Sequence, residues 1–243
     1  RLFTASYSVC DRWFLDDHRT KAGDALVPGT GFLEMATQAL RAQGEKSAFE
    51  IKDLYFLRPL AVSDDEAREI RVTLPRSDVG YDFVVESGAD GVFEQNAQAS
   101  LSLVPFGAPD PLDIAAIAAR CDPPREAGEL GWITSQQEAH LQFGPRWHVL
   151  QSTAYGKAEG WARLRLPDAA RDDARAGYLL HPGLMDLATG WAMKLIEGYN
   201  GDHLWVPVSY RSVKVYGALA PEIISWVRSS GENRTDSEVA SFD

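Results

Sequence analysis

The sequence has 243 residues, of which 45% are hydrophobic and 24% charged, so it can bury the core of one large domain or of two fused small ones. Its net charge of −11 argues against nucleic acid and against an anionic membrane surface as partners, because both attract Lys and Arg. No apolar stretch approaches the roughly 20 residues that cross a bilayer, and no leader suggests secretion, so we expect a cytoplasmic protein. The sequence begins at Arg1 without a methionine, which suggests a piece of a longer polypeptide.

The N-terminal half combines one amphipathic helix with several strands. Between residues 31 and 44 the apolar side chains fall on one stripe, which predicts a helix that ends at Gly44. Apolar and polar residues then alternate, which predicts strands, and Pro59 must end or kink the first of them. The predicted strands span residues 49–62, 69–75, 81–86 and 94–104.

The C-terminal half shows the same combination of one helix and several strands, after a linker. Residues 105–131 contain five prolines around one short apolar run, which is typical of a linker that holds a single helical turn. A second apolar stripe then predicts a helix over residues 182–198, with Gly198 at its end. Alternation predicts further strands at residues 162–167, 206–217, 222–230 and 238–243.

The two predicted helices share features that suggest an internal repeat. Each follows a Pro-Gly pair, and residues 34–38 can be superposed on residues 186–190. Each half then consists of strands around one apolar helix. We therefore expect two tandem α+β units, residues 1–104 and 132–243, joined by the linker 105–131.

Several common active-site motifs are missing. The segment GTGFLE begins like a dinucleotide-binding loop, but Glu34 stands where the third glycine belongs, and its carboxylate would repel a pyrophosphate. Neither a nucleophile elbow, a Walker loop nor HExxH occurs. The five histidines form no pair at helical spacing, and Cys10 and Cys121 lie far apart, so we expect neither a metal site nor a disulfide framework.

Two polar residues near the two Pro-Gly helix starts are the candidates for chemistry. His18 precedes the first Pro-Gly by ten residues, and Asp186 lies in the opening turn of the second helix, off its apolar stripe. An acid at a helix start can simply be stabilised by the helix dipole, by about 0.3–1 kcal/mol, and needs no function. If the two units pack helix against helix, however, His18 and Asp186 meet in a cleft. Such a pair suits proton abstraction beside a carbonyl together with proton delivery to a leaving hydroxyl.

Three short segments carry a resemblance to a known family. DHRTKAGDALVPG, with His18, Gly23 and Pro28, is similar to H-x-x-x-G-x-x-x-x-P; HLQFGPRW is similar to G-Y-x-Y-G-P-x-F; and HPGLMDLATG, with Asp186, is similar to H-P-A-L-L-D-x-x-x-Q/H. VPVSYRSVKVYG also resembles L-P-F-S-W-R-G-V. The segments occur in family order over nearly the whole chain. The sequence therefore resembles the dehydratase domain of type I polyketide synthases, which has a double hot-dog fold.

The resemblance implies a fold and a reaction. The fold would be α+β, with two tandem hot-dog units, each a curved antiparallel sheet around a central helix. His18 would take an α-proton from a β-hydroxyacyl thioester, and Asp186 would protonate the departing hydroxyl to leave an α,β-unsaturated thioester. The substrate would arrive on the phosphopantetheine of an acyl carrier protein, without cofactor or metal. Neighbouring synthase domains would be further partners, and a homodimer is a common arrangement in this family.

The resemblance also implies contacts with the substrate. Backbone N–H groups near Gly23 and at the start of the first helix would hold the thioester oxygen. Arg211 would contact the phosphopantetheine phosphate or the carrier protein, unless it is a solvated edge-strand cation. The other aromatic residues, including Trp147, are expected in the core, and His181 at the start of the second helix. The expected substrate-binding residues are Gly23, Pro28, Phe32, Leu141, Phe143, Gly144, Pro145, Gly190 and Tyr210.

Three departures from the family pattern leave alternatives open. The loop after His18 carries one extra residue, Leu141 and Phe143 replace the tyrosines, and Gly190 stands where the family has Gln or His. These changes make the surroundings of Asp186 less polar, which should raise its pKa. The same fold could then serve double-bond isomerisation, ring closure by adding a hydroxyl to the enoyl product (an oxa-Michael cyclase), or inactive scaffolding of the synthase.

Overall fold

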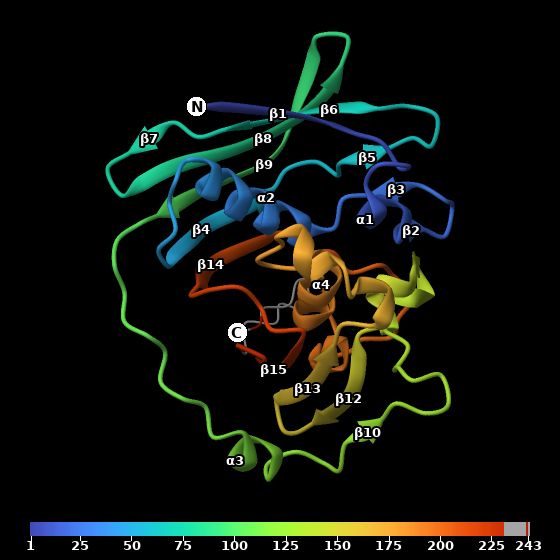
Figure 1. Cartoon of the computed structure of the whole chain (residues 1–243). Coiled ribbons are helices and arrows are strands. Elements are labelled where there is room, and N and C mark those ends of the chain that lie inside the picture. The colour runs from blue at the N-terminus through green and yellow to red at the C-terminus, as the bar shows by residue number, and fades with distance from the viewer. Residues whose placement is uncertain (231–241, 243) are drawn as a thin grey trace.

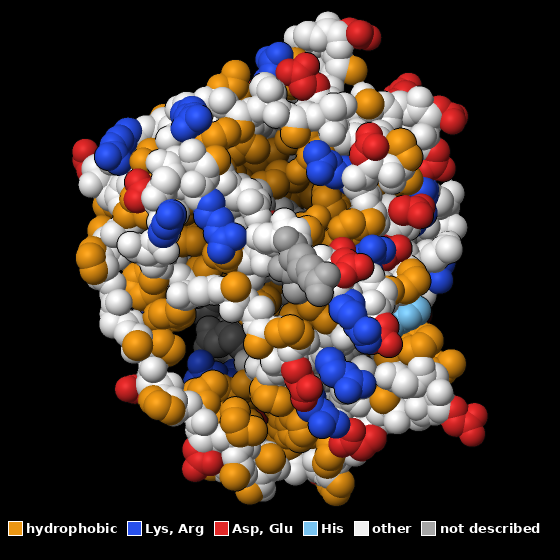
Figure 2. All heavy atoms as spheres, viewed as in Figure 1, with side chains coloured by type: hydrophobic (Ala, Val, Ile, Leu, Met, Phe, Trp, Pro, Cys, Tyr) orange, Lys and Arg blue, Asp and Glu red, His pale blue; other side chains and the backbone are white. Residues whose placement is uncertain are grey.

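The computed structural model describes residues 1–230 and 242, and the side chains of residues 174 and 175 are left aside (Figure 1). The strand expected at 238–243 therefore lies outside the described residues except for Phe242, which forms an antiparallel bridge with Ser229. Among the described residues, no helix combines the length and the hydropathy that crossing a bilayer requires. Acidic and basic side chains alternate over the face shown in Figure 2, so this face has no extended basic region.

A large antiparallel sheet forms one side of the molecule (Figure 1). Its strand order is β1-β6-β8-β9-β4-β14, and the short β7 pairs with β8. The predicted strand at 49–62 splits, because Pro59 cannot donate to a ladder: β4 ends at Phe56 and β5 pairs elsewhere. The strands of the large sheet are β1 (Leu2–Tyr7), β4 (Phe49–Phe56), β6 (Arg68–Thr73), β7 (Arg76–Ser77), β8 (Gly80–Ala89), β9 (Val92–Ser102) and β14 (Ser209–Val215).

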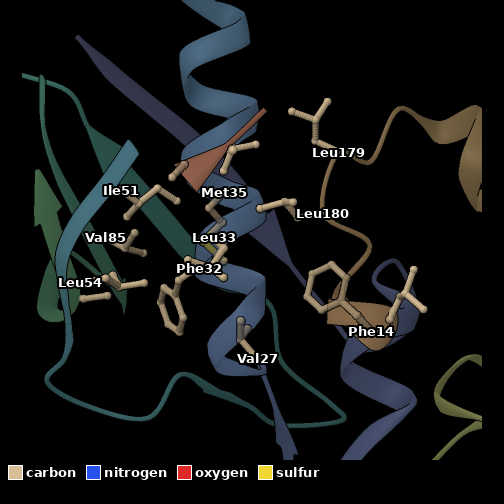
Figure 3. Close-up of a cluster of buried hydrophobic side chains, with 14 of the residues drawn as sticks. Phe14, Val27, Phe32, Leu33, Met35, Ile51, Leu54, Val85, Leu179 and Leu180 are labelled. Atoms are coloured by element: carbon tan, nitrogen blue, oxygen red, sulfur yellow. The ribbon is translucent and has the colours of Figure 1, made fainter. Parts of the chain in front are cut away.

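The longest helix, α2 (Gly29–Ala42), lies against this sheet. Its apolar stripe is buried as the sequence predicts, and Gln43 and Gly44 follow its end. Gly29 is required at its start because a Cβ there would lie 2.8 Å from Cγ of Pro207. In Figure 3, side chains of α2 pack between the sheet and the segment before α4. This cluster comprises Phe32, Leu33 and Met35 of α2, Ile51 and Leu54 of β4, Val85 of β8, and Leu179 and Leu180.

The remaining strands form two four-stranded antiparallel sheets. The order β11-β2-β3-β5 joins the segment around His18 to the HLQF segment, which lies more than a hundred residues later. The order β10-β12-β13-β15 belongs to the C-terminal half. Their bounds are β2 (His18–Thr20), β3 (Ala25–Leu26), β5 (Ala61–Val62), β10 (Arg125–Glu126), β11 (Leu141–Phe143), β12 (Leu150–Tyr155), β13 (Glu159–Arg165) and β15 (Glu222–Arg228).

The second long helix, α4 (Pro182–Gly190), packs on β13 and β15. The prediction that it continues to Gly198 is wrong. After Gly190 the chain leaves the helix, which glycine favours, and Trp191 turns toward β15, where its Nε1 donates to Oγ of Ser225 at 3.0 Å. The other helices are short: α1 (Trp13–Asp16), α3 (Ile114–Ala118) inside the expected linker, and the 3₁₀ helices η1 (Gln136–Ala139), η2 (Pro145–Trp147), η3 (Asp168–Ala170), η4 (Asp173–Ala176) and η5 (Met193–Leu195).

The strand β14 connects the two halves of the sequence. It follows α4 in the chain, yet it pairs with β4 of the N-terminal half over Ser209–Val215. The helices α2 and α4 also touch, because Oγ1 of Thr30 donates to the carbonyl oxygen of Pro182 at 3.2 Å. The expected helix-to-helix seam between the halves is therefore present.

Glu34 holds the segment before α4 onto α2. Its carboxyl group is buried and accepts hydrogen bonds from the backbone N–H groups of Leu179 and Leu180, at 3.2 and 2.7 Å. Thr37 and Gln38 donate to it from the same helix. Burial raises the pKa of Glu34 even though these donors oppose the shift. Glu34 is thus a structural acid that fixes where α4 begins.

We expect Glu34→Ala to lower the free energy of unfolding by about 2–4 kcal/mol, because two buried N–H groups lose their acceptor. Urea unfolding followed by circular dichroism measures this loss. Glu197→Ala, at an exposed glutamate, is the control and should stay within about 0.5 kcal/mol of the original chain. Equal stabilities for the two variants would contradict the structural role of Glu34.

Candidate functional site

His18 begins β2 and is buried, with 7% of its surface exposed. Its Nδ1 lies 3.0 Å from the carbonyl oxygen of Leu26, on the strand that pairs with β2. A carbonyl oxygen can only accept, so Nδ1 carries the proton of the neutral ring. This hydrogen bond leaves the lone pair on Nε2, where it can act as a base.

The extra residue after His18 lies in an exposed turn. Residues 21–24 are exposed between β2 and β3, and Gly23 has a φ of +103°, which favours glycine. The N–H of Gly23 donates to the carbonyl oxygen of Thr20 at 3.0 Å. The insertion therefore bulges away from His18, and the structure does not bring Gly23 to the site.

The HLQFGPRW segment lies directly beside His18. In the β2–β11 pair Phe143 is opposite His18, and the two rings stack with centroids 5.7 Å apart. The N–H of Gly144 donates to the carbonyl oxygen of Asp17 at 2.9 Å. Gly144 has no room for a side chain, since a Cβ would lie 2.0 Å from Oδ1 of Asp17. Leu141 is buried at the start of β11, and Pro145 begins η2.

Trp147 connects the base to the acid. It is 1% exposed, and its ring centroid lies 5.5 Å from that of His18. The indole Nε1 donates a hydrogen bond of 2.9 Å to Oδ2 of Asp186. Gly183 lets α4 come this close, because a Cβ there would lie 2.8 Å from the carbonyl oxygen of Arg146. His18 and Asp186 thus contact the same indole ring.

The pKa of the Asp186 carboxyl is raised above its ordinary value. Desolvation is the largest cause, and it outweighs the attraction of a protonated His18 and the hydrogen bond from Trp147, which both favour the ionised form. Trp147 binds Oδ2, so Oδ1 is left to carry a proton. The expectation of a raised pKa is confirmed, and the carboxyl group is suited to donate a proton.

We expect Trp147→Phe to raise the pKa of Asp186 further, because the indole N–H stabilises the carboxylate more than the acid. Phenylalanine keeps most of the buried ring but has no donor. A carboxyl ¹³C NMR titration measures the shift. Trp132→Phe is a control, because Trp132 stacks on His148 instead; an unshifted Asp186 titration in Trp147→Phe would contradict the assigned bond.

A network of polar and charged side chains connects the segment before His18 to the start of α4. Nε of Arg146 donates to Oδ2 of Asp173 at 2.7 Å, and the backbone N–H of Arg146 donates to Oδ2 of Asp17 at 3.2 Å. Asp173 also lies 3.3 Å from Nε2 of His181. Nδ1 of His181 accepts the N–H of Leu184 at 3.3 Å and so caps α4, as expected of His181. Burial lowers the pKa of His181, which keeps it neutral and able to accept.

Aromatic residues from three elements are linked to α4 through Tyr210. The hydroxyl of Tyr210, on β14, lies 3.3 Å from Oγ1 of Thr189, and burial raises the pKa of Tyr210 to about 12. Phe56 contacts both Tyr210 and Phe32, with centroids 5.8 and 5.7 Å away. Tyr210 and Phe32 are therefore linked through Phe56. Arg211 follows Tyr210 on β14 and is exposed.

The structure brings four of the expected residues together. His18, Phe143, Gly144 and Asp186 meet around Trp147, and Pro28 caps the start of α2. Gly190 lies on α4 one turn after Asp186, where the side chain of Gln137 covers it. Sequence reasoning missed the donor role of Trp147, although a tryptophan stands where the motif ends in phenylalanine. In the described part of the chain, no group of three or more His, Cys, Asp or Glu could hold a metal ion.

Family models match almost the whole chain. Residues 1–88 match the model described as polyketide synthase dehydratase domain, and residues 109–243 match the one described as polyketide synthase dehydratase N-terminal domain. Polyketide synthase PksM of Bacillus subtilis is 24% identical over 95% of this chain. The spectinabilin synthase protein NorB of Streptomyces orinoci is 31% identical over 85% of it. The chain spans only 6% and 9% of the length of these two relatives.

Solved structures share the fold. The dehydratase domain of the CurF module of curacin polyketide synthase has a TM-score of 0.82 at 19% identity, over 99% of this chain and 86% of that one. A trans-AT dehydratase domain from Brevibacillus brevis has a TM-score of 0.85 at 22% identity, over 100% and 86%. Two structures of the CurK dehydratase are described as inactive mutants, one His to Phe and one Asp to Asn. These likenesses confirm the α+β double hot-dog fold.

Proposed function

The chain belongs to the dehydratase domains of polyketide synthases, and we propose that His18 and Asp186 perform its dehydration of a β-hydroxyacyl thioester. The observation that carries this assignment is that a histidine base and a carboxylic acid both contact the indole ring of Trp147. The inactive CurK variants, in which a histidine or an aspartate is replaced, support the pairing by analogy.

His18 acts as the base. Its Nδ1–H is held by the carbonyl oxygen of Leu26, so Nε2 is the atom that takes the α-proton of the thioester. Phe143 and Trp147 restrict the tilt of the imidazole ring. The positive charge that develops on His18 is then close enough to Asp186 to stabilise its carboxylate, which is the product of the second proton transfer.

Asp186 acts as the acid. Its raised pKa keeps a proton on the carboxyl group, and this proton passes to the β-hydroxyl as the C–O bond breaks. The electron pair of the broken C–H bond forms the C=C bond, and the hydroxyl leaves as water. The hydrogen bond from Trp147 to Oδ2 stabilises the resulting carboxylate.

The start of α2 can hold the thioester oxygen. The first N–H groups of a helix have no acceptor within the helix, and they carry its positive dipole end. At α2 these are the N–H groups of Gly29 and Thr30, because the N–H of Gly31 donates to Pro28. Since the N–H of Gly23 is already bonded in its turn, the N–H groups of α2 replace it in the proposal.

The substrate would arrive on the phosphopantetheine of an acyl carrier protein in the same synthase, and exposed Arg211 would contact its phosphate or the carrier. His18 removes one proton from the substrate and Asp186 supplies one, so the proposed reaction needs no cofactor. The other residues proposed to touch the acyl chain are Phe32, Phe143, Gly144, Pro145, Gly190 and Tyr210. A cytoplasmic homodimer with neighbouring synthase domains is the arrangement we propose.

Mass spectrometry of a carrier-bound substrate tests this function. The chain is incubated with a β-hydroxyacyl carrier protein, and we expect the acyl group to lose the mass of one water. Mass-neutral conversion of an enoyl substrate, without water loss, would instead indicate an isomerase or a cyclase. Binding without any conversion would indicate a scaffold.

A further inference from the structure

The side chain of Gln137 covers α4 one turn after Asp186. A Cβ on Gly190 would lie 3.1 Å from both Nε2 and Oε1 of Gln137, and 3.3 Å from its Cδ. The two polar atoms of the amide are thus closer to Gly190 than its carbon is. Residues four apart in a helix share a face, so Gln137 brings an amide to the face of α4 that carries Asp186.

The oxygen of this amide has no partner among the described residues. Gln137 is 8% exposed, yet its Oε1 has no hydrogen-bond partner in the described part of the chain. A buried amide oxygen without a donor destabilises the fold. The helix η1 does not need it either, because Ser135 and Glu138 form the capping box of that helix.

We propose that Gln137 binds the β-hydroxyl group of the substrate through Oε1, an inference that rests on the proposed function. Oε1 accepts a hydrogen bond from the hydroxyl hydrogen, and Asp186 donates its proton to the hydroxyl oxygen. When the C–O bond breaks, its electron pair stays with this oxygen, which leaves as water still bound to Gln137. Gln137 gains and loses no proton in the step, so it orients the leaving group.

Gly190 favours this arrangement. A Cβ there would lie 3.1 Å from Nε2 and Oε1 of Gln137, so the amide would have to shift, and the missing Cβ leaves room for a glutamine that comes from η1 instead of from α4. The amide of Gln137 thus reaches the Asp186 face of α4 from η1, a different segment of the chain.

Gln137→Leu tests the proposal by separating activity from stability. Leucine keeps a similar volume but offers no acceptor, so we expect kcat/KM to fall about tenfold, the size of one lost hydrogen bond to the reacting group. The melting temperature should stay equal or rise, because the unpaired Oε1 is removed. The matched control is Gln136→Leu: its Oε1 is also unpaired, but Gln136 lines a cavity with Tyr155 and Lys194 instead of lying over Gly190, and the activity of this variant should be unchanged.

Binding to an inactive chain gives a second measurement. In a His18→Ala background, affinities are measured for the N-acetylcysteamine thioesters of 3-hydroxybutyrate and butyrate. We expect Gln137→Leu to weaken the hydroxyacyl thioester about tenfold and to leave the butyryl thioester unchanged. Equal weakening of both, or of neither, would overturn the proposal. If Gln137→Leu does not fold, the affinities for the same two thioesters are measured with Gln137→Ala.

The two proposals fail in different ways. If the original chain does not remove water from a β-hydroxyacyl thioester, the proposed function is wrong. If it does, and Gln137→Leu retains both the activity and the preference for the hydroxyacyl thioester, only the role of Gln137 is wrong.

Discussion

Replacing His18 by alanine is expected to lower kcat for dehydration by about 10²–10⁴-fold, the range found when a general base is removed. The substitution deletes the lone pair on Nε2 that the bond from Nδ1 to Leu26 leaves available. The fold should persist, because strand pairing of β2 with β11 and β3 uses the backbone. Single-turnover assays with a β-hydroxyacyl carrier protein measure the loss.

His203→Ala is the matched control for this prediction. His203 is exposed, and its removal should change kcat less than about twofold, as is usual for surface substitutions. A His18→Ala chain with nearly full activity would remove the histidine from the mechanism and leave Asp186 without a base.

Replacing Asp186 by asparagine is expected to lower kcat by a similar factor of about 10²–10⁴, because the amide cannot give up a proton to the hydroxyl. Asparagine can still accept the indole N–H of Trp147, so packing at α4 should be preserved. The variant therefore tests the proton rather than the shape of the side chain. Asp168→Asn, at a side chain that is 92% exposed, is the control and should remain active.

The pH dependence of the unsubstituted chain gives an independent check. Desolvation raises the pKa of Asp186, and only the protonated carboxyl donates, so kcat/KM should fall as pH rises through this raised pKa. Trp147→Phe should move the descending limb to higher pH, because it removes a hydrogen bond that favours the carboxylate. In Asp186→Asn the limb should vanish from the residual activity; an unmoved limb in that variant would assign the acid to another group.

Local sequence patterns predicted the elements better than their partners. The apolar stripe located α2 to within two residues at either end, and Pro59 marked the break between β4 and β5. The stripe through Trp191 wrongly extended α4, since Trp191 is equally well buried outside a helix, against β15. Alternation predicted β14, but nothing local in it reveals that its neighbour is β4.

In the candidate site, too, the sequence predicted individual residues better than the contacts between them. His18 and Asp186 were predicted because spaced motifs mark them in the sequence. Trp147 was expected only as a core residue, because its hydrogen bond to Asp186 joins residues 39 positions apart and depends on how η2 meets α4. The contact of Gln137 with Gly190 also arises from tertiary packing. The position of Gly23 could not be predicted, since an inserted residue can be accommodated on either side of a turn.

The place of β14 beside β4 also bears on how the chain forms during synthesis. Ser212 on β14 bonds to Glu50 on β4 across 162 positions of sequence, so the large sheet depends on a contact of very high sequence separation. Until the ribosome has released β14, β4 presents a bare strand edge, and such edges are where nascent chains pair wrongly with one another. Completion of the N-terminal sheet, and with it protection from aggregation, therefore waits until β14 has been made, more than a hundred residues after the end of β9.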